Sequence, residues 1–510
     1  MQWLNEVVGL IIKTKPDGEV VVSSGVSPSG TYHLGTLREI LTAEAVAREL
    51  RFRGRKVRHI HFVDDLDALR KVPAGVPAEF KKYLGQPLCD VPSPDAQAKS
   101  YADFYLADLL AAQGKLRIDM EVVRSHEKYR AGFFVPAIEA TLDKMDSVRQ
   151  AMEEVAGRKL DPNWSPIQVT EDGYLKSRKF LAINKQDQTV GYQDLAGNTQ
   201  TIGYNDGQVK LDWRVDWPAR WWLLKVDFEP FGRDHATAGG SYDTGAAIIK
   251  ETFGGQPPIP LPYEFINRSG QTKKMSKSAG ETISLSHLLE VLPTEVIWYF
   301  ILRFPAGKQL YFDEGDGVVK LIDDFAQVLA KKDKTTEQEQ LVRLSTDGQP
   351  VNTVSNIPFS HLVSSYQAAL KDPADTLGVL ERTEYAQDVK EQGPIIEKEL
   401  LFIDRWLAKW AEDDVKFELM QKVDPEKFNQ AEKNYLSRLA DAMAKEPADA
   451  DGDTLHKVIY QFKQTDGFTP EQLFVPLYRC LIGKSSGPRA GWFLSILPRE
   501  WLLKRLRLEE

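Results

Sequence analysis

The alternation of apolar and polar positions near the start of the chain predicts a strand, a glycine-containing turn, a helix and a second strand. Residues 19–24 (EVVVSS) are a β-branched run that ends in the loop GVSPSG at 25–30. VRHIHFV at 57–63 is the next strand, and the acidic run DDLD at 64–67 follows it. The helix between the strands is indicated by apolar residues at helical spacing, namely Leu34, Leu37, Leu41 and Ala45. Because ligands bind beyond the carboxyl ends of parallel strands, the two loops should face one pocket.

The later segments predict an α/β fold that is interrupted once and then followed by helices. Helical patterns at about 96–113 and 126–156 flank a strand at 120–125, and the α/β pattern resumes at 215–232, about 240 and 262–266. Residues 157–212 carry several glycines among short alternating runs, which indicates small antiparallel strands inserted into the α/β domain. From about 282 onward the pattern is helical almost to the end. We therefore expect a parallel-sheet domain with a β-rich insertion and an all-helical C-terminal region.

Length and composition bound the class of protein. With 510 residues, the chain is long enough for about three domains of roughly 150 residues each. Its 42% hydrophobic and 27% charged residues exclude disordered and fibrous classes, and no apolar run is long enough to span a bilayer or resembles a secretion signal. We expect a cytoplasmic protein that makes no membrane contact.

The charge and the cysteines exclude some partners and sites. The net charge of −9 argues against unselective nucleic-acid coating, although RELRFRGRKVR at 48–58 is a local basic stretch or simply a solvated helix end. The only cysteines, Cys89 and Cys480, lie far apart, so a disulfide framework and a four-cysteine zinc site are both excluded.

The first strand-to-helix turn, PSGTYHLG at 28–35, has the features of a phosphate-binding turn. Its small residues let the backbone approach a phosphate chain, and the N-terminus of the following helix adds N–H groups and partial positive charge. It is not a Walker A loop, because GxxxxGK[ST] occurs nowhere in the chain. His33 could donate to phosphate oxygens from the first turn, although a histidine with a purely structural role remains open.

A second motif, KKMSKS at 273–278, follows the last α/β strand. Lys274 and Lys277 offer two ammonium groups beside two serine hydroxyls, on a short loop bounded by glycines. Such a loop can clamp a triphosphate while negative charge builds on the leaving pyrophosphate, whereas the alternative is a plain solvated basic loop. Finding both motifs in this order, each beside a sheet end, favours nucleotide chemistry.

These two motifs resemble the HIGH and KMSKS signatures of class I aminoacyl-tRNA synthetases. The match departs at Thr36, where the first signature ends in histidine. Within the class, the chain resembles the class I lysyl-tRNA synthetases through longer stretches, namely SGVSPSGTYHLGT, FVDDLDALRKVP, KLDWRVDWPARW, GRDHATAGGSYDTG and LYRCLIGKSSGPRAGWFLSIL. The resemblance implies a Rossmann-like catalytic domain that uses ATP with Mg²⁺ to activate L-lysine and then transfers it to tRNA(Lys).

The resemblance also implies site residues. Catalytic charge stabilisation would come from His33, Lys274 and Lys277. Nucleotide binding would involve Pro28, Gly30, His33, Gly35, Thr36, Asp234, Lys274, Met275, Ser276, Lys277 and Ser278. Lysine binding would involve Gly25, Ser27, Asp64, Asp65, Trp213, Trp217, His235 and Tyr263.

Physical chemistry supports such a lysine pocket but leaves alternatives. A desolvated ammonium needs a carboxylate, aromatic faces or both, and KLDWRVDWPARWW at 210–222 supplies four tryptophans and two aspartates. At least two of these tryptophans are expected to pack against the sheet instead. One of the acids Asp64 and Asp65 could cap a helix, Gly25 could serve only the turn, and Tyr263 could be a core residue.

The expected domain boundaries follow from the pattern and the resemblance together. Residues 1–156 and 213–300 would form the catalytic domain, 157–212 the insertion, 301–355 a helical linker that contacts the tRNA stem, and 356–510 the helical anticodon-binding domain. Members of the family often carry zinc-ribbon cysteine pairs in the insertion, whereas this insertion has none, so we expect no zinc and only the Mg²⁺ that accompanies ATP. We expect a monomer.

Three other functions remain open from the sequence. A glutamate or glutamine synthetase would share both signatures, but its pocket would need a basic or amide partner where this chain concentrates Trp and Asp. A nucleotidyltransferase that does not use tRNA would be much shorter. A non-catalytic tRNA-binding relative is disfavoured by the intact His33, Gly35, Lys274 and Lys277.

Overall fold

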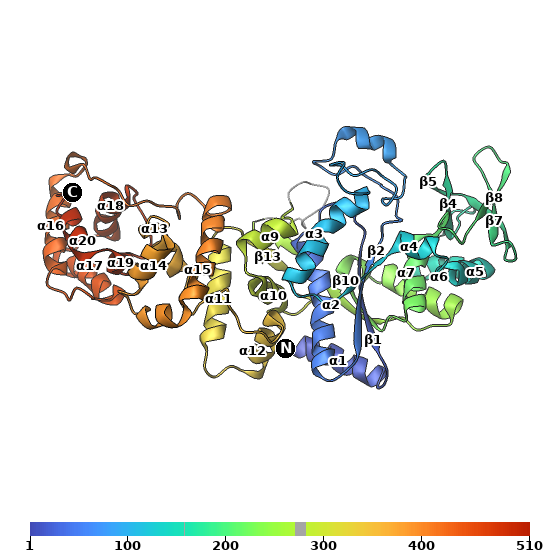
Figure 1. The fold of residues 1–510 in the computed structure, drawn as a ribbon, viewed down its shortest axis with the longest axis horizontal. Helices are drawn as coiled ribbons and strands as arrows, with labels where there is room; N and C mark the ends of the chain where they lie inside the picture. Colours follow the sequence, from blue (N-terminus) through green and yellow to red (C-terminus); the bar gives the residue numbers. More distant parts are fainter. Residues whose placement is uncertain (158, 271–281, 510) are drawn as a thin grey trace. The chain divides into compact units, whose positions relative to one another are not determined.

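The computed structural model describes residues 1–157, 159–270 and 282–509. By the contacts among its residues, the chain divides into two compact units. The first unit comprises residues 1–289, 297–312 and 335–348, and the second comprises 290–296, 313–334 and the chain from 349 onward. Each unit is described by itself below, with the elements labelled in Figure 1.

A parallel sheet forms the centre of the first unit. In the part of the chain that the structure describes, five strands pair in the order β11-β10-β1-β2-β3, all parallel. The strands are β1 (Val20–Val26), β2 (Val57–Val63), β3 (Glu121–Arg124), β10 (Phe228–Gly232) and β11 (Ile259–Tyr263). The β-branched run at the start of β1 is buried, as a strand covered on both faces requires. The predicted βαβ unit is thus confirmed, with the loops after β1 and β2 at one edge of the sheet.

Helices cover this sheet and connect its strands. They are α1 (Gln2–Thr14), α2 (Leu34–Phe52), η1 (Ala78–Tyr83), α3 (Tyr101–Lys115), α4 (Ser125–Arg130), α5 (Val135–Asp143), α6 (Met145–Ala156), α7 (Trp213–Leu224), η2 (Arg233–His235), α8 (Ser241–Ile248) and the π-helical turn η3 (Ile249–Phe253). The continuous helix predicted at 126–156 was wrong, because the segment divides into α4, α5 and α6. The break after α4 contains Gly132, whose φ of 72° lies in the left-handed region, and Pro136 lies in the first turn of α5.

The insertion consists of small antiparallel sheets, as the sequence predicted. Strands β4 (Ile167–Glu171), β5 (Tyr174–Ser177) and β9 (Val209–Leu211) form one sheet, and β6 (Lys179–Asn184), β7 (Thr189–Gln193) and β8 (Thr199–Gly203) form another. The β4–β5 hairpin turns through Asp172 and Gly173, both at positive φ, which matches the twist of the flanking strands. Buried residues such as Val169 and Leu211 share one apolar core with α7, so the insertion packs as part of the unit.

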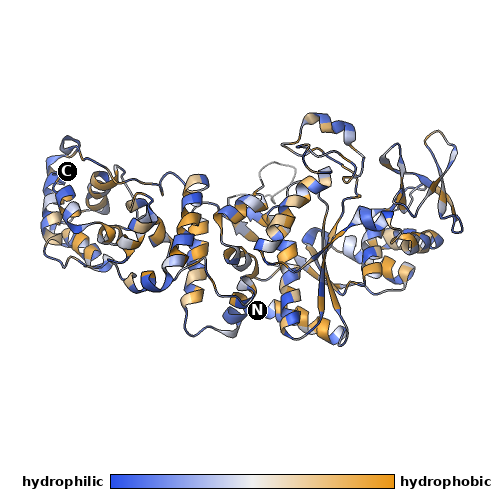
Figure 2. Cartoon of the chain, viewed as in Figure 1, coloured by the Kyte–Doolittle hydropathy of each residue, from blue (hydrophilic) through white to orange (hydrophobic). Residues whose placement is uncertain are grey.

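The second unit is built from helices. Its members are α11 (Asp316–Ala330), α13 (Phe359–Ala368), α14 (Pro373–Leu380), α15 (Ala386–Lys409), η4 (Pro425–Lys427), α16 (Gln430–Met443), α17 (Gly452–Asp466), α18 (Pro470–Ile482), α19 (Ala490–Ile496) and α20 (Arg499–Leu506). Figure 2 shows apolar stripes alternating with polar faces along these helices. Buried side chains from α16 to α20 form one core, which includes Leu439, Leu477 and Phe493.

The segment after residue 282 is mostly helical but includes one short strand. Helices α9 (Leu285–Val291), α10 (Thr294–Leu302) and α12 (Thr336–Thr346) were anticipated, whereas β13 (Leu310–Phe312), which pairs with β12 (Ile266–Arg268), was not. A three-residue strand is too short to show a period-2 pattern. Among the described helices none is long and apolar enough to cross a bilayer alone, and only the short helices α9 and α10, taken as a bent pair, pass that test by length and composition.

Candidate active site

A cavity of about 300 Å³ lies where β1, β2 and β10 end. Its walls come from β1, the loop after β2, β10, α2, α7 and η2. It is lined by Gly25, Glu39, Asp64, Asp67, Arg70, Trp213, Trp217, Arg220, Glu229, Pro230, Phe231 and His235. Five residues predicted to bind lysine therefore share one cavity, namely Gly25, Asp64, Trp213, Trp217 and His235.

Glu39 is the cavity residue that ties the first loop to the last strand. One carboxylate oxygen, Oε1, accepts from the backbone N–H of Gly25 at 2.7 Å, and Oε2 accepts from the Tyr263 hydroxyl at 2.7 Å. Burial, reinforced by Glu39, raises the pKa of Tyr263 well above its usual value, so the hydroxyl stays a donor. Tyr263 is therefore linked to the cavity only indirectly, by its hydrogen bond to Glu39. Glu39 was not predicted, because it projects from the interior of α2 and belongs to no motif.

Aromatic rings form one wall of the cavity. The ring of His235 meets Trp213 at 5.9 Å and Trp217 at 5.5 Å between centroids. The Trp217 indole donates to Glu229 at 3.2 Å, and Trp221 also donates to this carboxylate. As expected, two of the four tryptophans serve packing, because Trp221 is buried in the core and Trp222 stacks on Phe253.

Glu229 is a second cavity carboxylate that the sequence analysis missed. It lies inside the buried strand β10, and burial raises its pKa against the opposing hydrogen bonds from Trp221 and Trp217. In the sequence, Glu229 could have been recognised as a single acidic residue within the apolar run of this strand. A buried carboxylate is rare without a dedicated partner, so such a residue indicates a specific role.

Charged groups behind the cavity hold its aspartates in place. Arg220 donates to Asp64 at 2.6 Å and also pairs with Asp216, which accepts from the Tyr129 hydroxyl. Burial raises the pKa of Asp64 to about 7, with Arg220 opposing. Lys210, on strand β9 of the insertion, lies 3.0 Å from Asp67 and is itself buried. The insertion therefore supplies a cation that positions a cavity aspartate.

The structure places Asp65, which was also predicted to bind lysine, outside the cavity. Its side chain is fully buried and does not line the cavity. It accepts from Arg124 Nε at 2.6 Å and from the backbone N–H of His126 at 2.9 Å, while the His126 ring lies 2.7 Å away. The backbone contact satisfies an N–H at the start of α4, so Asp65 takes the helix-capping role that the sequence left open.

The turn before α2 is held by His33, Gly35 and Thr36. His33 is the N-cap, and its Nδ1 accepts from the Gly35 N–H at 3.0 Å, which leaves the ring proton on Nε2 as a donor. A Cβ at position 35 would lie 2.8 Å from His33 Cε1, so a side chain there would displace the His33 ring. The Thr36 hydroxyl accepts from the His33 backbone N–H at 3.3 Å. Thr36 therefore caps the helix at the position where the signature has histidine.

A second cavity of about 220 Å³ adjoins the first. The two share Asp67 and Arg70 as lining residues, and the second is also lined by Ser27, Ser29, Ala68, Lys71 and Pro73. Ser27 therefore lies beside the main cavity, and Pro28 and Gly30 are buried in the same loop. Within the described residues Arg70 and Lys71 form no ion pair. These two cations, which were not predicted as site residues, make the second cavity suited to anions.

The remaining predicted residues lie either outside both cavities or in the part of the chain that the structure does not describe. Asp234 lies on η2 next to His235 but does not line either cavity, and a Cβ at Gly232 would lie 2.6 Å from its Oδ1. Lys274, Met275, Ser276, Lys277 and Ser278 lie outside the described residues. Within the described ranges, no group of three or more His, Cys, Asp or Glu side chains is arranged to hold a metal ion.

The chain is similar to known proteins over its full length. Residues 1–347 match the family model "tRNA synthetases class I (K)", and residues 379–508 match "Anticodon binding domain". A "Lysine--tRNA ligase" of Archaeoglobus fulgidus is 33% identical over 99% of both chains, and one of Thermococcus kodakarensis is 34% identical over the full length of both. A solved glutamate tRNA ligase of Elizabethkingia meningosepticum is 11% identical, with a TM-score of 0.44 over 96% of this chain and 98% of that chain. The chain therefore belongs to the class I (K) tRNA synthetase family.

Proposed function

We propose that the protein is a lysine–tRNA ligase, which activates L-lysine with ATP to lysyl-adenylate and transfers the lysyl group to tRNA(Lys). The observation that carries the proposal is the charge of the main cavity. Four carboxylates line it, namely Glu39, Asp64, Asp67 and Glu229, against the two guanidinium groups of Arg70 and Arg220. An excess of carboxylates beside aromatic walls suits an amino acid with two ammonium groups.

Glu39 and Asp64 are the proposed partners of the two lysine ammonium groups. Both carboxylates face the cavity and are fixed by hydrogen bonds at distances of 2.6–2.7 Å, so they need little reorganisation when a cation enters. The tryptophans Trp213 and Trp217 would enclose the aliphatic stem of lysine. An ammonium beside Asp64 favours its charged form, and so lysine binding would draw a proton away from this carboxyl.

The second cavity is the proposed place for the phosphates of ATP, which brings Mg²⁺ as its counterion. Arg70 and Lys71 would neutralise the phosphates together with Lys274 and Lys277, and His33 Nε2–H would donate a hydrogen bond to a phosphate oxygen. A lysine carboxylate oxygen attacks the α-phosphorus, the bond to pyrophosphate breaks, and no side chain becomes covalently attached. A terminal ribose hydroxyl of tRNA then attacks the carbonyl carbon, loses its proton and displaces AMP. The side chains act by alignment and charge stabilisation.

A glutamate-specific pocket fits this cavity poorly. A glutamate side chain would need a cation that is not already paired, and Arg220 already binds Asp64 and Asp216. Arg70 lies between the two cavities, where it is better placed for a phosphate. The excess of carboxylates would also repel a second acid.

The tryptophan wall gives a first test with lysine and with an analogue in which methyl replaces the ε-amine. Replacing Trp213 or Trp217 by Phe should cost about 0.5 to 2 kcal/mol in kcat/KM for lysine, because aromatic area is kept while cation attraction weakens. Alanine should cost more, since contact area is lost too. Pyrophosphate exchange kinetics measure both effects.

The methyl analogue should be rejected strongly by the wild-type protein, because it leaves a buried carboxylate without its cation. Trp222→Phe, which changes a tryptophan packed on Phe253 outside the cavity, is the matched control. Normal lysine kinetics in both alanine variants, with only the melting temperature lowered, would show that the two rings serve packing alone.

Metal content gives a second test. The purified protein should contain no stoichiometric zinc, because the insertion carries neither paired cysteines nor cysteine–histidine pairs at ligand spacing. Its activity should require only Mg²⁺ with ATP and should survive a zinc-selective chelator. Elemental analysis checks this directly, and about one zinc per chain would contradict the prediction.

A further inference from the structure

A cluster of buried charges behind the main cavity joins the insertion to the proposed lysine site. Strand β9 of the insertion contributes Lys210, α7 contributes Asp216 and Arg220, and the loop after β2 contributes Asp64 and Asp67. Asp216 is fully buried, Lys210 is 1% exposed and Arg220 is 8% exposed, whereas the side chains of Asp64 and Asp67 reach the cavity. Charges that are shielded from water interact strongly, so these five groups influence one another.

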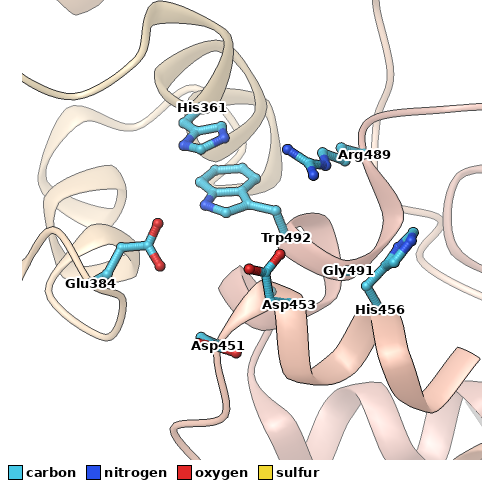
Figure 3. A pocket seen from close by; sticks show the side chains of 9 residues that line it. His361, Glu384, Asp451, Asp453, His456, Arg489, Gly491 and Trp492 are labelled. Atoms are coloured by element: carbon cyan, nitrogen blue, oxygen red, sulfur yellow. The ribbon is translucent and has the colours of Figure 1, made fainter.

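Burial distinguishes this cluster from the charged groups around a cavity of the helical unit. Figure 3 shows that cavity, of about 260 Å³, with charged side chains around Trp492. Its acids and its arginine are all exposed, namely Glu384, Asp451, Asp453 and Arg489, so water and salt screen them. The charges behind the main cavity lack this screening. Their sum must therefore be balanced within the protein, by a proton or by a ligand.

Lys210 is held in the cluster by two carboxylates and one aromatic ring. Its Nζ lies 3.0 Å from Asp67 Oδ1 and 4.0 Å from Asp216 Oδ2, and 5.9 Å from the centre of the Tyr129 ring. The Tyr129 hydroxyl donates to Asp216 at 2.5 Å and accepts from the Leu211 backbone N–H at 3.2 Å. These two bonds tie β9 to α7, so the Lys210 ammonium is fixed between the two carboxylates.

The cluster has one more negative group than positive groups. Burial opposes the charged form of Lys210, but the three aspartates outweigh it and raise its pKa, so the side chain stays an ammonium. Lys210 and Arg220 thus supply two positive charges against Asp64, Asp67 and Asp216. Asp64 lies at the cavity wall, and burial raises its pKa to about 7, with Arg220 opposing. A substrate ammonium beside Asp64 would supply the missing positive charge in place of a proton.

We propose that Lys210 is a positioning residue for the lysine site, whose buried ammonium, together with Arg220, leaves one unbalanced negative charge for one substrate ammonium. Lys210 lines neither cavity and acts through Asp67 and Asp64. Without it, two negative charges are left over, and Asp64 keeps its proton to a higher pH. The inference rests on the proposed function, because it concerns the site that this function assigns to lysine.

The groups around Asp64 determine the sign of the pH dependence. They are Arg220 and Asp216 from α7, Lys210 from β9, Asp67 from the same loop and Tyr32 from the loop after β1, and the cavity adds Glu39, Arg70, Glu229 and His235. Tyr32 stays neutral, because burial, reinforced by nearby carboxylates, raises the pKa of its hydroxyl. Lysine binding needs the charged form of Asp64, so kcat/KM for lysine should rise with pH and level off above about 7.

The test is the pH profile of kcat/KM for lysine in ATP–pyrophosphate exchange. In Lys210→Met, which keeps the length of the side chain but not its charge, the midpoint of the rise should move up by about one pH unit, the lower end of the shift that a neighbouring charge commonly causes. The variant should therefore lose about tenfold at pH 6.5 and stay within about threefold of the wild type at pH 8.5. Lys210→Gln, which keeps a donor for Asp67, should move the midpoint in the same direction.

A charge-compensated variant separates the charge of Lys210 from its packing. Lys210→Met combined with Asp67→Asn removes one charge of each sign, so its midpoint should return to that of the wild type. Lys176→Met is the matched control, because Lys176 lies on β5 of the same small sheet and lines neither cavity. Its profile should equal that of the wild type.

Three results would overturn the proposal. They are an unchanged profile in Lys210→Met, a loss that is equal at every pH, and a shifted midpoint that persists in the double variant. If Lys210→Met does not fold, the first two results apply to Lys210→Gln. Lysine-dependent exchange by the wild-type protein is the separate check of the proposed function, because its absence would contradict that function whatever the variants do.

Discussion

Replacing Glu39 by glutamine should lower kcat/KM for lysine in pyrophosphate exchange by about 10²- to 10³-fold, the range expected when one member of a buried charge pair is lost. Glutamine has nearly the same shape, and its amide can still bond both the Gly25 N–H and the Tyr263 hydroxyl, which lie 2.7 Å from the native carboxylate. The loss should therefore come from the missing negative charge, with little change in the melting temperature.

Two analogues show which ammonium Glu39 binds. Lysine without its α-amine and lysine without its ε-amine should be tested as competitive inhibitors of wild-type protein and Glu39→Gln. The analogue that lacks the relevant amine should bind both proteins equally. Glu121→Gln, on β3 and away from the cavity, is the control. Normal lysine kinetics in Glu39→Gln would remove Glu39 from the pocket and leave Asp64, Asp67 and Glu229 as the possible partners.

Replacing His33 by asparagine should lower the adenylation rate by about 10²- to 10³-fold with little change in the KM for lysine, as for a donor that acts mainly in the transition state. Asparagine is among the best N-caps, so it can replace His33 Nδ1 as acceptor for the α2 backbone. It cannot place a donor where Nε2–H lies. The adenylation rate is measured by single-turnover formation of the adenylate. The contribution of the helix cap to stability is measured by thermal unfolding.

The asparagine variant distinguishes a catalytic role of His33 from a purely structural role as the N-cap of α2. If His33 only caps α2, His33→Asn should keep both the activity and the stability of the wild type. That result would contradict the catalytic role. His33→Ala should lose both activity and stability. His287→Asn, at an exposed position on α9, is the control for a histidine-to-asparagine change.

The parts of the fold that the sequence predicted are those encoded by local pattern. β1, α2 and β2 carry the β-branched runs and the helical apolar spacing of a βαβ unit, and the glycine-rich stretch at 157–212 correctly indicated short antiparallel strands. The segment at 126–156 was mispredicted because its apolar spacing was given more weight than Gly132 and Pro136, which lie where the structure interrupts the helix.

The cavity residues that the sequence predicted lie at strand ends, as Gly25, Asp64 and His235 do, or in the tryptophan-rich stretch that gives Trp213 and Trp217. Glu39 projects from the interior of a helix and Glu229 from the interior of a strand, so neither was predicted. Asp64 and Asp65 are adjacent residues of the same type, so the sequence cannot show which of them lines the cavity. The position of α4 determines this, because Asp65 accepts from a backbone N–H at the start of that helix. The role of Lys210 depends on where the insertion folds back, which no local pattern encodes.

The most direct test of the account is ATP–pyrophosphate exchange measured separately with each of the twenty standard amino acids. The account predicts exchange with lysine, with every other amino acid at least about 10²-fold lower in kcat/KM, because a cavity with an excess of carboxylates penalises any ligand without the second ammonium. Exchange driven by glutamate or glutamine, or no exchange with any amino acid, would contradict it.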